Sequence, residues 1–220
     1  MDRAPATRML LDALTKIVPP ADLGLVDRLI SEGADPNGLA PFPSPLVEAL
    51  EMGDFDLAAL LLDAGADPNA AAEIGRTPLH VAANLGREDL VALLLSAGAK
   101  ADPERQGNPG DWARTPLEMA LWRGFPEAAK LLLAAGASPN IRDPWGDAPL
   151  HAAARDGDAG MAQTLLGFGA DPSVRNEKGL TAEEVAVGDA KVFLSSISVK
   201  KALDDCLSDV PTVPGRPGGV

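Results

Sequence analysis

Two histidines are the side chains in this sequence best suited to chemistry, because imidazole can ligate a metal or act as a general base. They are His80, in Thr-Pro-Leu-His-Val-Ala-Ala, and His151, in Ala-Pro-Leu-His-Ala-Ala-Ala. The matching context indicates equivalent places in two copies of a repeat, two units apart. Packed helix layers lie about 8–10 Å apart, so two units separate the rings by roughly 20 Å. We therefore predict that the histidines share no metal and are structural.

Other catalytic arrangements are not visible in the sequence. Cys206 has no histidine near it in sequence, which argues against a catalytic thiol. The acid pairs Glu183-Glu184 and Asp204-Asp205 are more simply a helix cap and a solvated helix end. No phosphate-binding glycine-rich loop, Cys-x-x-Cys pair or His-Glu-x-x-His motif is present. We expect no enzymatic activity, no catalytic residue, no cofactor and no metal.

The elements that position these side chains repeat with a period of about 33 residues, which is typical of a stacked array. The Thr-Pro-Leu-His motif at Thr77 returns in degenerate form at Ser44, Thr115, Ala148 and Thr181. A Gly-Ala pair keeps step with it, at Gly33, Gly65, Gly98, Gly136 and Gly169. The two motifs together divide the chain into similar units that share one continuous core.

Each unit is predicted to form two helices and a turn. In the clearest one, Thr77 caps the first helix, Pro78 occupies its first position and Gly86 ends it. A second helix begins at Glu88, with an apolar face from Leu90 onward, and Gly98 supplies the left-handed residue that stops it. Thr115 with Glu118, and Thr181 with Glu184, have the spacing of a capping box.

This pattern resembles the ankyrin repeat family over roughly residues 21–194. The resemblance implies an all-α, helix-turn-helix solenoid of about five to six repeats, in which the histidine hydrogen-bonds within and between turns. We expect one domain over 1–206, made of a capping unit at 1–38, central repeats at 39–175 and a shortened closing unit at 176–206. The Pro- and Gly-rich segment 207–220 is predicted to be disordered, and five extra residues fall within Asp102 to Asp111.

Charge and composition limit the partners. The formal net charge is −13, which disfavours unaided binding to nucleic acid, whose phosphates attract Lys and Arg. No apolar run approaches the roughly 18 residues that span a bilayer, so no membrane association is expected. The segment Met9 to Val18 contains Asp12 and Lys16 and makes a poor signal peptide. With one cysteine and no disulfide framework, we expect a cytoplasmic protein that is monomeric when free.

All three tryptophans are predicted to lie on one face. In ankyrin-like arrays the turn tips and first helices line a concave groove that binds protein partners. By their offset from each helix start, Trp112 and Trp145 belong to turn tips and Trp122 to a first helix. Tryptophan and arginine are enriched at binding hot spots, and the arginines of this face are predicted to contribute: Arg76, Arg114, Arg123 and Arg155. The alternative is that each tryptophan packs on a neighbouring turn.

Acidic residues dominate the stretch between Arg28 and Arg76, which contains no Lys or Arg. Glu48, Glu51 and Asp54 lie outside the turn motif and form a possible patch that steers a basic partner; the alternative is a solvated flank. The preferred function is therefore non-catalytic protein binding through the concave face. Two alternatives stay open: an inhibitor or immunity-type protein that masks a basic active site with this acidic half, and a regulatory subunit of an enzyme.

Overall fold

The regular secondary structure of the described residues is entirely helical. A computed structural model describes residues 4–16, 22–38, 44–70, 76–103 and 114–208, and these residues contain no strand. The helices are α1 (Ala4–Lys16), α2 (Leu23–Ser31), α3 (Pro45–Glu51), α4 (Phe55–Asp63), α5 (Pro78–Leu85), α6 (Glu88–Ser96), α7 (Pro116–Arg123), α8 (Pro126–Ala134), α9 (Pro149–Asp156), α10 (Ala159–Gly167), α11 (Ala182–Val185) and α12 (Gly188–Ser208). Consecutive helices pair, and we number the pairs repeats 1 to 6. The predicted all-α solenoid is confirmed.

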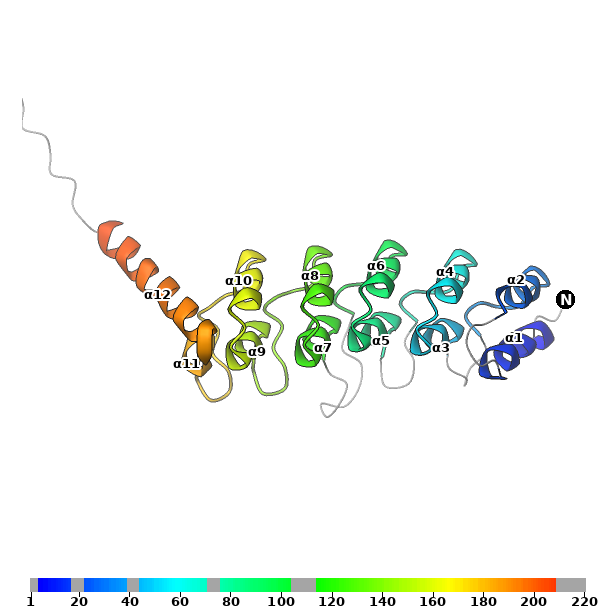
Figure 1. Ribbon diagram of the computed structural model, residues 1–220, viewed down its shortest axis with the longest axis horizontal. Coiled ribbons are helices and arrows are strands. Elements are labelled where there is room, and N and C mark those ends of the chain that lie inside the picture. The colour runs from blue at the N-terminus through cyan, green and yellow to red at the C-terminus, as the bar shows by residue number, and fades with distance from the viewer. Residues whose placement is uncertain (1–3, 17–21, 39–43, 71–75, 104–113, 209–220) are drawn as a thin grey trace, which may run out of the picture.

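The pairs stack side by side into two layers (Figure 1). The first helices α3, α5, α7 and α9 form one row, and the second helices α4, α6, α8 and α10 form the other. The connections that lead into α9 and α11 extend beyond the first-helix row, on the side away from the second helices (Figure 1). Side chains of these connections and of the first helices therefore share one face of the array.

Local sequence accounts for where the first helices begin and end. The backbone N–H of Thr115 donates to Glu118 Oε2 (2.6 Å), and the N–H of Glu118 donates to Thr115 Oγ1 (3.2 Å). The same reciprocal pair joins Thr181 and Glu184 at α11. Both predicted capping boxes are confirmed, and each satisfies two backbone donors that a helix start leaves unpaired. Gly86, predicted to end α5, does so with φ of 66°, in the left-handed region.

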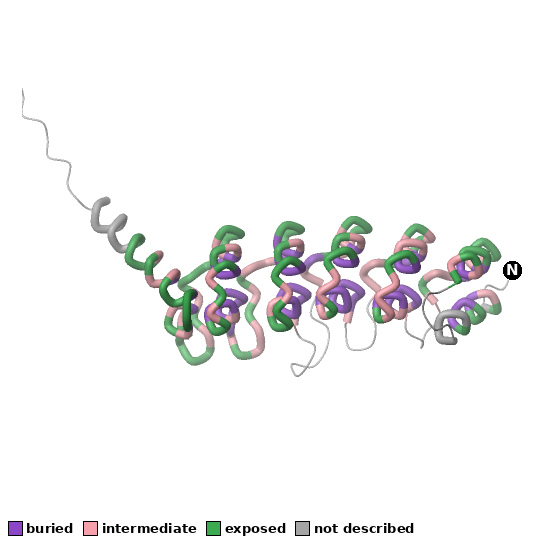
Figure 2. The backbone as a smooth tube through the Cα atoms, in the orientation of Figure 1, coloured by how far each residue is buried: buried purple, intermediate pink, exposed green. Residues whose placement is uncertain are grey.

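Buried residues run along the stacked helix pairs (Figure 2), and most of them are leucine and alanine. Equivalent leucines recur at the second position of each first helix and on the second helices, and all are at most 1% exposed: Leu46, Leu79, Leu117 and Leu150, with Leu61, Leu94, Leu132 and Leu165. Fully burying one such side chain contributes about 1.5–3 kcal/mol. Small alanines between them let neighbouring helices approach closely.

Asparagine side chains cross-link successive turns. Asn69 Oδ1 accepts the backbone N–H of Lys100 (2.8 Å), and its Nδ2 donates to the carbonyl of Gly98 (3.1 Å). Asn140 makes the same two bonds with the turn of the next repeat, through Asp171 and Gly169. The turn formers that follow each Gly-Ala pair thus also hold neighbouring repeats in register.

The corners between first and second helices carry further links. Phe125 of repeat 4 lies over Gly86, where an added Cβ would come within 2.5 Å of the phenyl ring. The N–H of Val187 in repeat 6 donates to the carbonyl of Ala154 in repeat 5 (3.0 Å). At the equivalent corner of repeat 4, an added Cβ on Gly124 would meet no described atom within 4 Å. The junction between repeats 4 and 5 therefore lacks a contact that its two neighbours have.

The closing unit, predicted as a shortened repeat, has one short and one long helix. Its first helix, α11, has only 4 residues, but its second helix, α12, has 21 residues and continues to Ser208. Leu194 of α12 is buried against the stack, whereas Val192 and Val199 are 73% and 60% exposed. Further along, α12 runs out past the end of the array (Figure 1). The segment predicted to be disordered, 207–220, begins within α12, which includes residues 207 and 208; residues 209–220 lie outside the described part of the chain.

Candidate functional site

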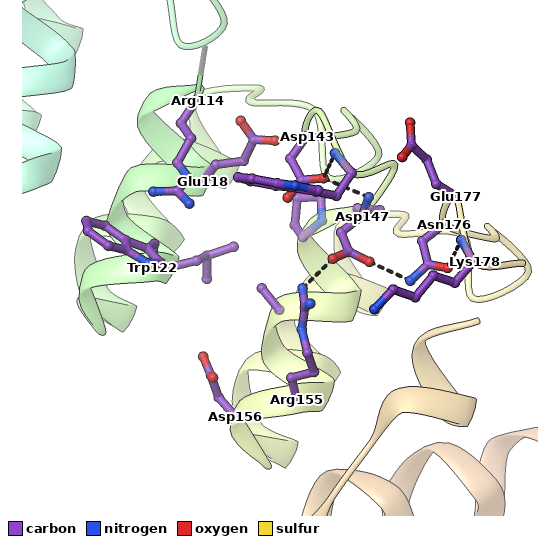
Figure 3. Close-up of a pocket in the computed structure, with 15 residues that line it drawn as sticks. Arg114, Glu118, Trp122, Asp143, Asp147, Arg155, Asp156, Asn176, Glu177 and Lys178 are labelled. Atoms are coloured by element: carbon purple, nitrogen blue, oxygen red, sulfur yellow. Dashed lines mark hydrogen bonds and ion pairs between the residues drawn. The ribbon is translucent and has the colours of Figure 1, made fainter. Parts of the chain in front are cut away.

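A pocket of about 490 Å³ opens on the face shared by the first helices and the turn tips. It lies between α7 and α9, and the turns that lead into α9 and α11 close its outer side (Figure 3). Its main polar and aromatic lining residues are Arg114, Glu118, Trp122, Asp143, Trp145, Asp147, Arg155, Asp156, Asn176, Glu177 and Lys178. The lining therefore draws on three consecutive repeats.

Two tryptophans expose most of their surface at this pocket. Trp122 is 60% exposed and Trp145 is 57% exposed. Trp122 lies seven residues after Thr115, near the end of α7. Trp145 is held at a turn tip because Asp143 Oδ1 accepts the backbone N–H groups of both Trp145 and Asp147 (2.9 Å each). The structure thus brings together two of the three tryptophans expected on one face. Trp112 lies outside the described residues.

Two arginines surround Trp122. The guanidinium carbon of Arg114 lies 4.5 Å from the Trp122 ring centroid, and that of Arg123 lies 5.4 Å from it. Both distances are within the range of a cation–π interaction. Nε of Arg123 also donates to Oδ1 of Asn84 on α5 (2.8 Å), which anchors this arginine to repeat 3. The exposed indole is therefore held in place by two positive charges.

A buried carboxylate organises the other side of the pocket. Asp147 is 7% exposed, and its oxygens accept from Arg155 Nη2 (2.5 Å) and Asn176 Nδ2 (2.8 Å). Figure 3 shows Arg155 and Asn176 approaching Asp147 from different elements. A buried carboxylate requires such partners, because removing an ion from water costs several kcal/mol. Arg155, which we predicted as a binding residue, lines the pocket but also has this structural role.

The histidines link repeats. The backbone N–H of Thr77 donates to Nδ1 of His80 (3.1 Å), so the ring proton resides on Nε2, which contacts the carbonyl of Arg114 (3.0 Å). His151 likewise accepts from the N–H of Ala148 and reaches the carbonyl of Leu180 through Nε2. Burial lowers the pKa of His80 from 6.5 to about 4; the hydrogen bond to Arg114 opposes this and the charge of Arg76 adds to it. In the described residues, no three His, Cys, Asp or Glu side chains gather where they could hold a metal ion.

Comparison with known families agrees with this repeat geometry. The family model for ankyrin repeats (3 copies) matches residues 20–107 and 117–194. The chain belongs to the ankyrin repeat family. A search of curated proteins finds no match to it. The predicted hydrogen bonds of His80 and His151, within a turn and to the next, are confirmed. Across the described ranges, no helix of this ankyrin array has the length and apolar character to cross a membrane.

Two of the three residues of the predicted acidic patch, Glu51 and Asp54, have partners in the ankyrin array. Glu51 forms an ion pair with Arg76 (3.3 Å between Oε1 and Nη1). Arg76, which we predicted as a binding residue, is not among the residues that line the pocket. Asp54 is the N-cap of α4 and accepts the N–H of Leu57 (3.0 Å). Glu48 is half-buried in α3. The patch is therefore partly built into helix starts and repeat contacts.

Several pocket residues were not predicted from the sequence. Lys178 stands three residues before Thr181, the same offset that placed Trp145 at a turn tip, so the repeat alignment contained the information needed to find it. Asp147 and Asn176 carried no comparable pattern, because their roles depend on contacts across two repeats.

Proposed function

We propose that the protein is a non-catalytic binding module whose protein partner occupies the pocket between α7 and α9. Ankyrin repeats are generally protein–protein interaction modules. The observation that carries the proposal is the exposure of Trp122 and Trp145, 60% and 57%, at one concave site. Large aromatic side chains ordinarily bury most of their area, and tryptophan is the residue type most enriched at binding hot spots.

The support around these side chains favours a preformed site. Trp122 is positioned by Arg114 and Arg123, and Trp145 by the hydrogen bonds of Asp143. Side chains that are already ordered lose less conformational entropy when a partner binds. The alternative that both tryptophans are core residues is disfavoured by their exposure. Their loss should therefore affect binding more than folding.

Truncation of each tryptophan tests this function. The wild-type protein immobilised on a resin captures partners from a lysate of its source cells, and the captured protein is then purified and titrated by calorimetry. Trp122→Ala and Trp145→Ala should each weaken its Kd by roughly thirtyfold, equivalent to about 2 kcal/mol. Both variants should keep the wild-type melting temperature within a few degrees.

The matched control is Val192→Ala, which removes an apolar side chain that is 73% exposed on α12, away from the pocket. It should leave affinity unchanged. Equal binding by wild type and both tryptophan variants would refute the pocket as the binding site. A loss of stability in proportion to the loss of binding would instead identify the tryptophans as packing residues.

A further inference from the structure

The two arginines around Trp122 have hydrogen-bonding capacity that the fold does not use. Arg114 makes no side-chain hydrogen bond or ion pair with the described residues, and Arg123 makes only the Nε bond to Asn84. Four other arginines of the array are paired with carboxylates, as Arg76 is with Glu51 and Arg155 with Asp147. Arg114 and Arg123 have no such partner among the described residues, and both lie at the same indole ring.

Stacking on an indole leaves the N–H edge of a guanidinium available. A guanidinium that lies with its flat face on a ring projects its donors from the rim, in the fork that matches a carboxylate. Arg114 is half-buried beside the pocket, so part of its desolvation has already occurred on folding. An acceptor reaching this point would meet donors whose orientation is already fixed by Trp122 and Asn84.

We propose that Arg114 and Arg123, held around Trp122, form a subsite for a carboxylate of the partner protein, an Asp or Glu side chain in an acidic segment. The inference rests on the proposed function, because it names the chemistry recognised at one end of the same pocket. A bidentate guanidinium–carboxylate pair supplies both charge and direction. The segment would place its carboxylate against α7 and an apolar side chain toward Trp145.

The remaining charges of the pocket favour a single carboxylate over a polyanion. Asp156 at the end of α9 and Glu177 in the turn before α11 line the same pocket and are exposed, and neither has an ion-pair partner among the described residues. A nucleic acid presents a phosphate about every 1.7 Å along a duplex and would meet these acids. A peptide can present one acidic residue at Arg114 and neutral or basic residues beyond it.

A random dodecapeptide library displayed on phage provides the probe. Peptides are selected on the wild-type protein, and those that fail to bind Trp145→Ala are kept. We expect these peptides to share an Asp or Glu at one position. Synthetic peptides with that residue changed to Asn or Gln should bind wild type on the order of tenfold more weakly. For the Arg114→Gln, Arg123→Gln double variant, the Kd values of the acidic and amide peptides should differ by less than about twofold. The two guanidinium groups that would bind the carboxylate are then absent.

Arg28→Gln on the outer helix α2 is the control for loss of one positive charge, and it should keep the full preference for the acidic peptide. Melting curves confirm that the variants are folded, and Arg114→Gln alone serves if the double variant unfolds. Groove-binding peptides with no acidic preference, or a preference that persists in the arginine variants, would overturn the carboxylate subsite while leaving the proposed function standing. If no selected peptide depends on Trp145, both proposals fail.

Discussion

Acidification from pH 7 to pH 5 should destabilise the fold through His80. This side chain is 7% exposed and is neutral in the folded state, because burial lowers its pKa from 6.5 to about 4. Between these two pKa values the unfolded chain binds a proton that the folded chain does not, so stability rises with pH. The contribution is fully present above the unfolded pKa and is lost as pH falls toward the folded pKa.

The magnitude follows from the two pKa values. The full difference corresponds to about 3 kcal/mol, of which about 2 kcal/mol is lost between pH 7 and pH 5. The measurement is urea unfolding followed by circular dichroism at both pH values, for wild type and for His80→Gln. Because urea is uncharged, the ionic strength stays the same throughout the titration. Every other titrating group is common to the two proteins, so the difference between their pH dependences isolates His80.

His80→Gln should be less stable than wild type at pH 7, because it disturbs the hydrogen bonds to Thr77 and Arg114. Its loss of unfolding free energy on going to pH 5 should be smaller than that of wild type by about 2 kcal/mol. Equal losses in the two proteins would refute the reasoning, since His80 would then carry the same charge in the folded and unfolded states.

Three further substitutions test the contacts between repeats. Gly86→Ala and Gly124→Ala both place a Cβ at a left-handed position, at a cost of about 1 kcal/mol, but only the Cβ at Gly86 meets the Phe125 ring, at 2.5 Å. Gly86→Ala should therefore cost about 1–3 kcal/mol more in urea unfolding, and equal costs would argue against that packing. Asn69→Asp keeps an acceptor for the next turn but removes the N–H donor to the carbonyl of Gly98. It should therefore lower the free energy of unfolding by about 1 kcal/mol. A melting temperature equal to that of wild type would contradict a stabilising role for the Asn69–Gly98 bond.

The sequence predicted the features that each repeat determines locally. The helix starts at Thr115 and Thr181, and the glycine stop at Gly86, depend on residues a few positions apart, and the structure confirms them. The offset of Trp122 and Trp145 from each helix start placed them on one face, because identical units stack with the same orientation.

Contacts between repeats were not predictable in the same way. Nothing in the local pattern marks Asp147 as the buried hydrogen-bond partner of Asn176 in the next repeat, or Glu51 as the ion-pair partner of Arg76. These roles depend on the path of the backbone and on which side chains meet across a junction. The length of α12 was also missed, because a helix that leaves the stack has no following repeat to limit it.

Among the described residues, hydrogen bonds are fewer between repeats 4 and 5 than between the pairs on either side. At the position of the bridging histidines, repeat 4 has Glu118, whose carboxylate oxygens accept hydrogen bonds and so do not replace the histidine donor to the next turn. At the corner of repeat 4, Gly124 lacks the described neighbour that Gly86 has in Phe125. Asn140 still connects the two turns, so it can act as a pivot.

Bending at this pivot would alter the pocket while leaving each repeat intact. Trp122 belongs to repeat 4 and Trp145 to the turn that leads into repeat 5, so they lie on opposite sides of this junction. A change in the curvature of the array alters the spacing between the two indoles without breaking the leucine core of either repeat. The spacing between the two indoles is then a second criterion for selecting a partner. A segment of the wrong thickness would have to change the angle between repeats 4 and 5 in order to bind.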